Sequence, residues 1–204
     1  MSYILFFDTE TTGLPKNSKI IASAQKGNWP DLVSISWIVF KNKTFLKKET
    51  HIIKPDGWTI PDESIKFHTI TNEQANLQGK PLLDVITKFK ADMDNCFCVV
   101  AHNMNFDKNV ILNACKWRLE DYMPFWENKL DFCTMIKSKK ELLLPSVNQY
   151  KSDPYKFPGL DELYRDTFKK EPPSGAHSAD RDVEVLQQIV WSRWPQLVTV
   201  YPKY

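Results

Sequence analysis

The sequence of 204 residues contains only six glycines, and it has no G-x-G-x-x-G and no G-x-x-x-x-G-K-[ST] segment. The glycine-rich loops that bind dinucleotides and nucleoside triphosphates are therefore missing. Four cysteines are present without a C-x-x-C pair, which disfavours a zinc site and favours buried free thiols. The formal net charge is only +2. This near balance disfavours a protein that coats nucleic acid through charge alone, because such domains are strongly basic.

Membrane and export signals are missing as well. The apolar run 3–7 near the N-terminus is far too short for a membrane span, and neither a basic start nor a small-residue cleavage site accompanies it. We therefore expect a soluble protein of a reducing compartment, the cytoplasm or the nucleus, with no membrane partner. The composition, 42% hydrophobic and 25% charged, is that of a globular protein. The length is suited to one domain over residues 1–204.

What is present is an alternation of apolar runs and chain breakers that predicts an α/β fold. The expected strands, of which the first three form a meander, span residues 3–7, 32–40, 44–53 and 97–101. The expected helices begin near residue 61 and span 81–93, 106–117, 160–168 and 178–194. A polar connection is expected over residues 16–30 and a surface loop over residues 145–158.

Two acids directly follow the first predicted strand. Asp8 and Glu10 are two residues apart, so on an extended segment their side chains point to the same face. Side by side at the end of a buried strand, they repel each other unless a cation lies between them. A hard divalent cation such as Mg²⁺ prefers carboxylate oxygens and would fit. For this pair taken alone, a solvated strand end followed by a turn is the alternative.

Two later segments place further acids beside predicted elements. Asp107 falls in the first turn of a helix, where the helix dipole by itself favours an acid. His177 lies at the start of the last helix, and Asp182 follows five residues later inside it. A solvated acidic helix start explains this last segment equally well. His102, after the fourth strand, is expected to be a hydrogen-bonded histidine at a strand end.

Together the three segments resemble the motifs of the DEDD 3′→5′ exonucleases, in their histidine-bearing (DEDDh, DnaQ-like) branch. That branch includes the proofreading epsilon subunit of bacterial DNA polymerase III. The matching text is FDTETTGLP, VAHNMNFDKNVI and AHSADRDVEVL, with softer matches at FHTITNE, LDFCTMIKS and FPGLDELYRDTF. The resemblance covers about residues 3–190. The tyrosine-bearing branch is disfavoured, because Ser178 stands four residues before the last acid. Thr69 departs from the pattern, since many relatives have glycine there, and it leaves the shape of that turn open.

The resemblance implies a ribonuclease H-like fold, in which helices flank both faces of a five-stranded mixed sheet. It also implies hydrolysis of phosphodiester bonds from the 3′ end, with release of nucleoside 5′-monophosphates, through two Mg²⁺ or Mn²⁺ ions. The implied metal ligands are Asp8, which bridges both ions, Glu10 and Asp182 on the ion beside the attacking water, and Asp107 on the other. The implied general base is His177, a role that histidine fills well near neutral pH. The implied substrate contacts are Thr11, Leu14, His68, Ile70, Asn103 and Phe106, each of which has an alternative role in packing or turn formation.

As substrates we expect single-stranded or frayed 3′ ends, with DNA favoured over RNA. A polymerase or another replication or repair protein is a candidate partner. Trimming of RNA or of short oligoribonucleotides is an alternative, because it uses the same five groups. A phosphatase of the haloacid dehalogenase kind is disfavoured by Glu10, where that family normally has aspartate. A catalytically silent binding domain is disfavoured because all five catalytic positions are filled. Lysines 137, 139, 140, 169 and 170 are either phosphate contacts or solvated, and the apolar tail 191–204 packs on the domain or on a partner.

Overall fold

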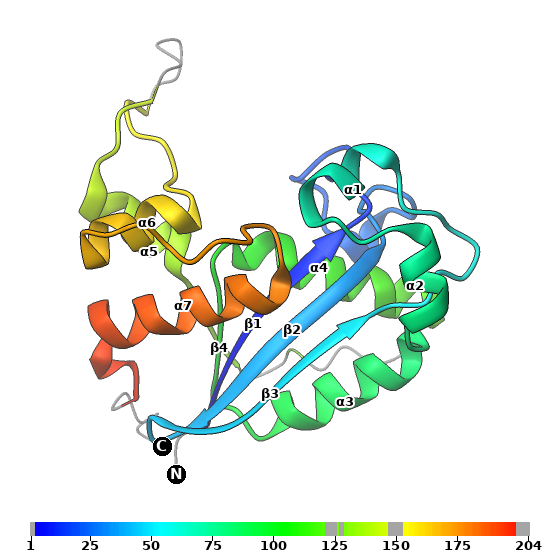
Figure 1. Cartoon of the computed structure of the whole chain (residues 1–204), viewed down its shortest axis with the longest axis horizontal. Helices are drawn as coiled ribbons and strands as arrows, with labels where there is room; N and C mark the ends of the chain where they lie inside the picture. Colours follow the sequence, from blue (N-terminus) through cyan, green and yellow to red (C-terminus); the bar gives the residue numbers. More distant parts are fainter. Residues whose placement is uncertain (1–2, 121–125, 127–128, 147–152, 199–204) are drawn as a thin grey trace.

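The computed structural model describes residues 3–120, 126, 129–146 and 153–198. Within them, five strands form one mixed sheet in the order β3-β2-β1-β4-β5 (Figure 1). The strands are β1 (Tyr3–Thr11), β2 (Leu32–Lys41), β3 (Thr44–Ile52), β4 (Cys98–Ala101) and β5 (Leu130–Cys133). The β1–β2 and β2–β3 pairs are antiparallel, and the β1–β4 and β4–β5 pairs are parallel. The predicted five-stranded mixed sheet and the meander of its first three strands are confirmed.

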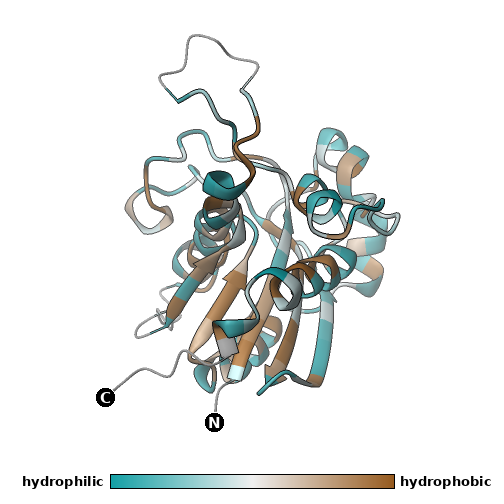
Figure 2. Cartoon of the chain, turned by 90° about the vertical axis from the view of Figure 1, so that its left-hand side faces the viewer, coloured by the Kyte–Doolittle hydropathy of each residue, from teal (hydrophilic) through white to brown (hydrophobic). Residues whose placement is uncertain are grey.

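Helices cover both faces of this sheet. They are α1 (Asp62–His68), α2 (Asn72–Gln78), α3 (Leu82–Asp94), α4 (Met104–Asn113), α5 (Thr134–Leu142), α6 (Leu160–Phe168) and α7 (Ala179–Arg193). Helices α3 and α4 pack on one face, and α6 and α7 pack on the other. Figure 2 shows the hydrophobic residues of the strands gathered between these layers. None of the helices in the described part of the chain is long and apolar enough to cross a bilayer.

Alternation along β1 decides which core each of its side chains joins. Leu5 and Phe7 belong to the core under α3 and α4, whereas Ile4 and Phe6 belong to the core under α6 and α7. Both phenylalanines are fully buried, and each contributes about 1.5–3 kcal/mol relative to an exposed ring. Because a slip of one residue would exchange the two faces, this burial fixes the register of the strand. The residues that follow Phe7 are therefore held at defined positions.

β1 is longer than the predicted strand 3–7. Its pairing with β2 continues as far as Thr11, opposite Leu32, whereas β4 pairs only with Ile4–Phe6. Asp8 and Glu10 consequently lie inside the strand and beyond the end of β4, where one edge of β1 is unpaired. The prediction that the strand ends at Phe7 is wrong, because the two neighbouring strands stop at different points.

Other elements differ from prediction through tertiary context. β5, α2 and α5 were not predicted as separate elements from their apolar patterns. The predicted helix 106–117 begins at Met104 and passes into a short π-helical turn, Ala114–Arg118. Residues 147–152 of the predicted surface loop 145–158 and residues 199–204 of the tail lie outside the described residues.

Thr69 ends α1 in a conformation that favours glycine. Its φ is 64° and its ψ is −2°, and its N–H donates a hydrogen bond to the carbonyl of Ile65. A left-handed conformation costs an L-residue about 1–2 kcal/mol, and a β-branched residue adopts it rarely. The turn therefore keeps a shape suited to glycine although threonine occupies it.

We expect Thr69→Gly to raise the free energy of unfolding by about 0.5–1 kcal/mol, because relief of this strain exceeds the extra backbone entropy that glycine loses on folding. For a chain of this size the melting temperature should rise by about 1–4 °C in calorimetry. Thr71→Gly is the matched control. Thr71 has a φ of −87° and its side chain accepts a hydrogen bond from the N–H of Gln74, so its loss should lower the melting temperature. A lower melting temperature for Thr69→Gly would show that the turn is not strained.

Candidate active site

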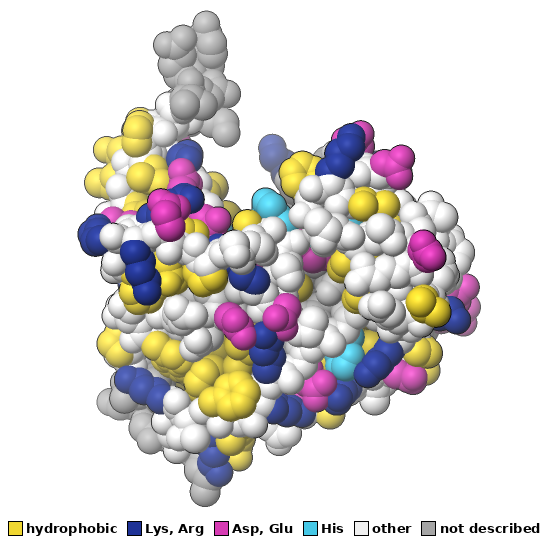
Figure 3. All heavy atoms as spheres, in the orientation of Figure 1, with side chains coloured by type: hydrophobic (Ala, Val, Ile, Leu, Met, Phe, Trp, Pro, Cys, Tyr) yellow, Lys and Arg dark blue, Asp and Glu magenta, His cyan; other side chains and the backbone are white. Residues whose placement is uncertain are grey.

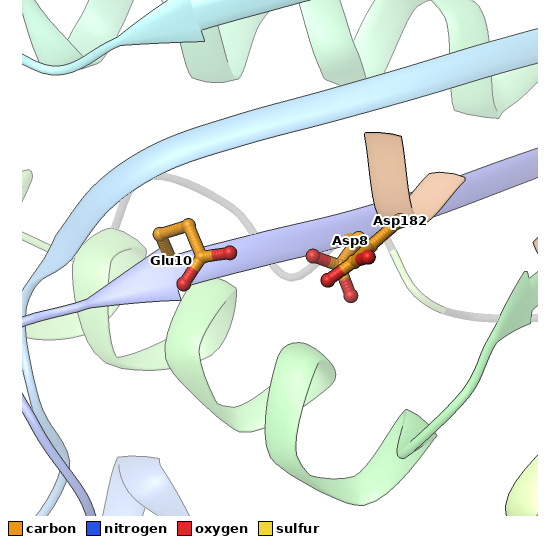
Figure 4. A group of neighbouring side chains, drawn as sticks. All are labelled: Asp8, Glu10 and Asp182. Atoms are coloured by element: carbon orange, nitrogen blue, oxygen red, sulfur yellow. The ribbon is translucent and has the colours of Figure 1, made fainter. Parts of the chain in front are cut away.

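Three carboxylates from two elements meet on the α7 face of the sheet. Asp8 and Glu10 of β1 and Asp182 of α7 each offer an oxygen, and these oxygens lie within 4.8 Å of one another (Figure 4). The residues opposite Asp8 and Glu10 on β2 are Ser36 and Ser34. These two serines interrupt the apolar run from Leu32 to Phe40, and their small side chains face the acids.

Asp107 approaches the same place from α4. Its side chain is buried, and its Oδ1 accepts hydrogen bonds from the N–H of Thr9 at 3.1 Å and from the Oγ1 of Thr9 at 2.7 Å. It lies in the first turn of α4, as predicted. Although Asp107 is not one of the three converging acids, its charge raises the pKa of both Asp8 and Glu10. The four acids therefore form one electrostatic group.

Burial raises the pKa of all four carboxyl groups, and repulsion by neighbouring acids raises it further for Asp8, Glu10 and Asp107. The pKa of Asp8 lies well above its ordinary value, through burial first and then through the charges of the other three acids. Burial and the charge of Asp182 raise the pKa of Glu10 to about 8, and burial raises the pKa of Asp107 to about 7. Burial also raises the pKa of Asp182, against the opposing effect of Arg181. Ionising four clustered, buried acids together is unfavourable unless a cation balances their charge, so this group indicates a cation site.

We expect the metal-free protein to lose stability as the pH rises from about 4 to about 8. A carboxyl group with a raised folded-state pKa holds its proton more tightly in the folded protein. Stability therefore falls between the unfolded-state pKa, about 4, and the folded-state pKa, and it levels off above the latter. The relevant values are about 7 for Asp107 and about 8 for Glu10. Mg²⁺ or Mn²⁺ should restore stability, most strongly at high pH, because the ion competes with protons. Thermal melts across this range, with and without each ion, check this expectation, and a flat metal-free profile would contradict it.

His177 lies just before α7 and beside Asp182. Its backbone N–H donates to the Oδ2 of Asp182 at 3.2 Å. Its exposed ring packs edge-on against Phe67 of α1, with 5.7 Å between the ring centroids. Its φ is 62°, a left-handed conformation that aims the side chain differently from a helical residue. The ring therefore lies between α1 and the acids and remains open to solvent.

A pocket of about 460 Å³ contains three of the acids and His177. Figure 3 shows this side of the molecule hollowed between α1 and the region of α5 and α6. Another hollow, of about 510 Å³, lies beside Trp58 and Trp117. It has none of the four acids in its lining, so the chemistry of the 460 Å³ pocket, and not its size, identifies the candidate site.

Four of the six predicted substrate contacts line this pocket, namely Thr11, Leu14, His68 and Phe106. Leu14 is 83% exposed, which makes it the most exposed large hydrophobic residue in the described part of the chain. Such a side chain at the rim of a pocket is free to contact a ligand. That these four residues contact substrate stays a prediction.

The other two predicted contacts do not line the pocket. Ile70 packs against the small core of Val33 and Ile60, and Asn103 precedes α4, where its carbonyl accepts the N–H groups of Phe106 and Asp107. Both roles are structural, and contact of these two residues with substrate stays a prediction. The lysines named above do not line the pocket either.

Sequence reasoning did not single out Thr9, Phe67 or Arg181. Thr9 holds Asp107, Phe67 supports His177, and Arg181 donates to Asp182. Thr9 could have been noticed, because strand alternation turns it away from the two acids beside it. Arg181 gives no such signal, since an arginine between two acids on a helix is normally solvated.

Comparison with known proteins adds a family and a fold. The model of the RNase T family, described as exonuclease, matches residues 5–190. No match was found among curated proteins. E. coli exonuclease I in complex with a dT13 oligonucleotide is similar in structure, with a TM-score of 0.70 and 19% identity over 97% of this chain and 42% of that chain. The zinc-bound E. coli exonuclease I–ssDNA complex has a TM-score of 0.70 and 20% identity over 98% and 42% of the two chains.

Exonuclease I from Methylocaldum szegediense is similar as well, with a TM-score of 0.67 and 17% identity over 98% of this chain and 42% of that chain. The chain therefore spans less than half the length of these exonuclease I chains. At such identities the likeness concerns the fold, and it confirms the predicted ribonuclease H-like architecture.

Proposed function

The chain belongs to the RNase T exonuclease family, and on this premise we propose that it is a metal-dependent 3′→5′ exonuclease that works as a single domain over residues 1–204. Membership agrees with the DnaQ-like class that the three motifs predict. The observation that carries the proposal is the convergence of Asp8, Glu10 and Asp182 in a pocket that His177 also lines. A phosphatase that uses Asp8 as nucleophile would leave Asp182 and His177 without a role.

The donor set is suited to hard divalent cations. The three converging groups are carboxylates, and Mg²⁺ and Mn²⁺ prefer such oxygen ligands over sulfur. We propose that Asp8, Glu10, Asp182 and Asp107 would hold two of these ions. When bound, such ions lower the pKa of the attacking water and stabilise charge on the transferring phosphate.

The groups of the chain itself orient the reactants and move the proton. We propose that His177 accepts the proton of the attacking water. Its ring is exposed at the pocket, and its backbone N–H donates a hydrogen bond to Asp182, which holds the residue beside the acids. Phe67 limits the positions of the ring. Thr9 holds the Oδ1 of Asp107 through its N–H and its hydroxyl.

We propose single-stranded or frayed 3′ ends as substrates and nucleoside 5′-monophosphates as products. Leu14 and Phe67 place exposed apolar surface around the pocket. Apolar and aromatic contacts of this kind tolerate any base, as the removal of successive nucleotides requires. DNA is favoured over RNA, in keeping with the similar E. coli exonuclease I structures that hold dT13 and single-stranded DNA.

Matched digestion tests the substrate. Single-stranded DNA, duplex DNA with a mismatched 3′ end, and RNA of the same sequence are incubated with the protein and Mg²⁺ or Mn²⁺. We expect the single strand to be digested fastest and the frayed duplex next. Faster digestion of RNA would reverse the proposed preference and assign the protein to RNA trimming.

The state of the cysteines bears on the cellular setting. The four cysteines are free thiols, so we expect a reducing compartment, the cytoplasm or the nucleus. Association with a polymerase or with a replication or repair protein stays a prediction.

A further inference from the structure

Arg181 is a buried cation in contact with Asp182, one of the proposed metal ligands. Arg181 lies in the first turn of α7 and is only 9% exposed. Each nitrogen of its guanidinium donates to an acceptor. We propose that Arg181 is a positioning residue that sets the orientation of Asp182 and holds the loop that carries His177. This inference rests on the proposed function, because it assigns Asp182 to metal binding and His177 to proton transfer.

The guanidinium joins Asp182 to a second helix. Its Nη1 donates to the Oδ1 of Asp182 at 2.6 Å and forms an ion pair with the Oδ1 of Asp161 in α6 at 2.7 Å. The Oδ2 of Asp182 accepts the backbone N–H of His177. Both oxygens of Asp182 are thus held, so the plane of its carboxylate is fixed while its remaining lone pairs stay available.

The same guanidinium holds the loop before α7. Its Nε and Nη2 both donate to the carbonyl of Pro173, at 3.0 and 2.7 Å. Between Pro173 and α7 the chain adopts positive φ at Gly175 (90°) and at His177 (62°). A residue other than glycine keeps such a conformation only where its surroundings impose it. The two bonds to Pro173 are part of that restraint.

The start of α6 is fixed to the sheet, which gives Arg181 a firm support. His102, at the end of β4, has its Nε2 3.0 Å from the carbonyl of Pro158 and its Nδ1 3.0 Å from the Oγ1 of Thr134. A carbonyl only accepts, so Nε2 donates to Pro158 and Nδ1 accepts from the threonine hydroxyl. Burial lowers the pKa of His102 to about 4, so the ring is neutral at physiological pH. The chain of contacts runs from β4 through α6 to Asp161 and Arg181.

Two accounts of Arg181 predict opposite changes in metal affinity. If only its charge mattered, its removal would tighten metal binding, since a nearby cation repels a divalent ion. If it positions Asp182, its removal should weaken binding, as loss of a residue that orients a metal ligand commonly does. A purely structural residue would change the melting temperature and leave the affinity of the folded protein unchanged.

The test compares Arg181→Met, Arg181→Lys and a matched control, Arg193→Met. Arg193 lies in the last turn of the same helix, pairs with Asp166 and Glu141, and does not line the pocket. Binding of Mn²⁺ to the metal-free protein is measured by calorimetry, and kcat and KM are measured on a single-stranded oligonucleotide.

We expect Arg181→Met to lower both Mn²⁺ affinity and kcat by about 10–100-fold, with little change in KM. Arg181→Lys should recover only part of this loss, because an ammonium group lacks the planar fork that reaches several acceptors. Arg193→Met should bind Mn²⁺ as the wild type does.

Unchanged or tighter Mn²⁺ binding in Arg181→Met, or full recovery in Arg181→Lys, overturns the proposal. If Arg181→Met does not fold, Asp161→Asn replaces it, because it frees the guanidinium from α6. It should show a smaller loss of Mn²⁺ affinity, and the absence of any loss overturns the proposal equally. A wild type that binds Mn²⁺ but digests no nucleic acid contradicts the proposed function instead, and the affinity comparison still decides the role of Arg181.

Discussion

Asp8→Asn should reduce kcat on a single-stranded oligonucleotide by about 10³-fold or more, because metal-ion catalysis supplies several kcal/mol and each 1.36 kcal/mol is a factor of ten. Asp8 is central among the acids, since the charges of Glu10, Asp107 and Asp182 all raise its pKa. Asparagine keeps the shape of the side chain but lacks the negative charge that would attract a divalent cation. The rate is measured at saturating substrate with Mg²⁺ and with Mn²⁺.

The same substitution should stabilise the metal-free protein at pH 8 and above. Ionisation of Asp8 is opposed by burial and by three acids, so the wild type loses stability as the pH rises and the variant loses less. Asp180→Asn is the matched control, because Asp180 pairs with Lys48 at the surface of α7 and is not among the converging acids. It should keep nearly full activity. An Asp8→Asn variant within tenfold of the wild-type rate would contradict the proposed role of Asp8.

His177→Asn should lower kcat by about 10²–10⁴-fold, the usual contribution of a positioned general base. Asparagine is the appropriate replacement because it tolerates the positive φ of 62° found at this position. Metal-induced stabilisation and KM should change little, since the side chain of His177 is not one of the proposed metal ligands. Single-turnover rates and thermal melts with Mn²⁺ measure the two effects separately.

Chemical rescue separates loss of the base from damage to the loop. His177→Gly also accepts the positive φ and leaves space beside Phe67, where the ring had packed. Added imidazole should restore part of the lost rate, because the position is exposed. A rate that imidazole leaves unchanged, together with weakened Mn²⁺ binding, would show that His177 acts through the loop and not as a base.

The local part of this site could be predicted from the sequence. The shared face of Asp8 and Glu10 follows from strand alternation, and the place of Asp107 in the first turn of a helix follows from the pattern around it. Both predictions need only the residues within a few positions of each acid along the sequence. The extent of β1 could not be predicted in this way, because it depends on how far β2 and β4 pair with it.

The tertiary part required either the family resemblance or the structure. Periodicity places Asp182 on a helix, but only packing of α7 against the sheet brings it to Asp8. β5 escaped prediction because it has four residues, of which the first two are exposed. Arg181 is buried because two acids and a carbonyl from three segments surround it, and no pattern along one segment reveals such a set.

Digestion of a 5′-labelled single-stranded DNA in parallel with a 3′-labelled copy tests the central claim most directly. With Mg²⁺ or Mn²⁺, the 5′-labelled strand should shorten through a ladder of products, while the 3′ label should appear at once as a nucleoside 5′-monophosphate. Chelation of the metal should stop both reactions. Release of the 5′ label as a mononucleotide, or intact 3′ ends with both metals and with both DNA and RNA, would contradict the assignment as a 3′→5′ exonuclease.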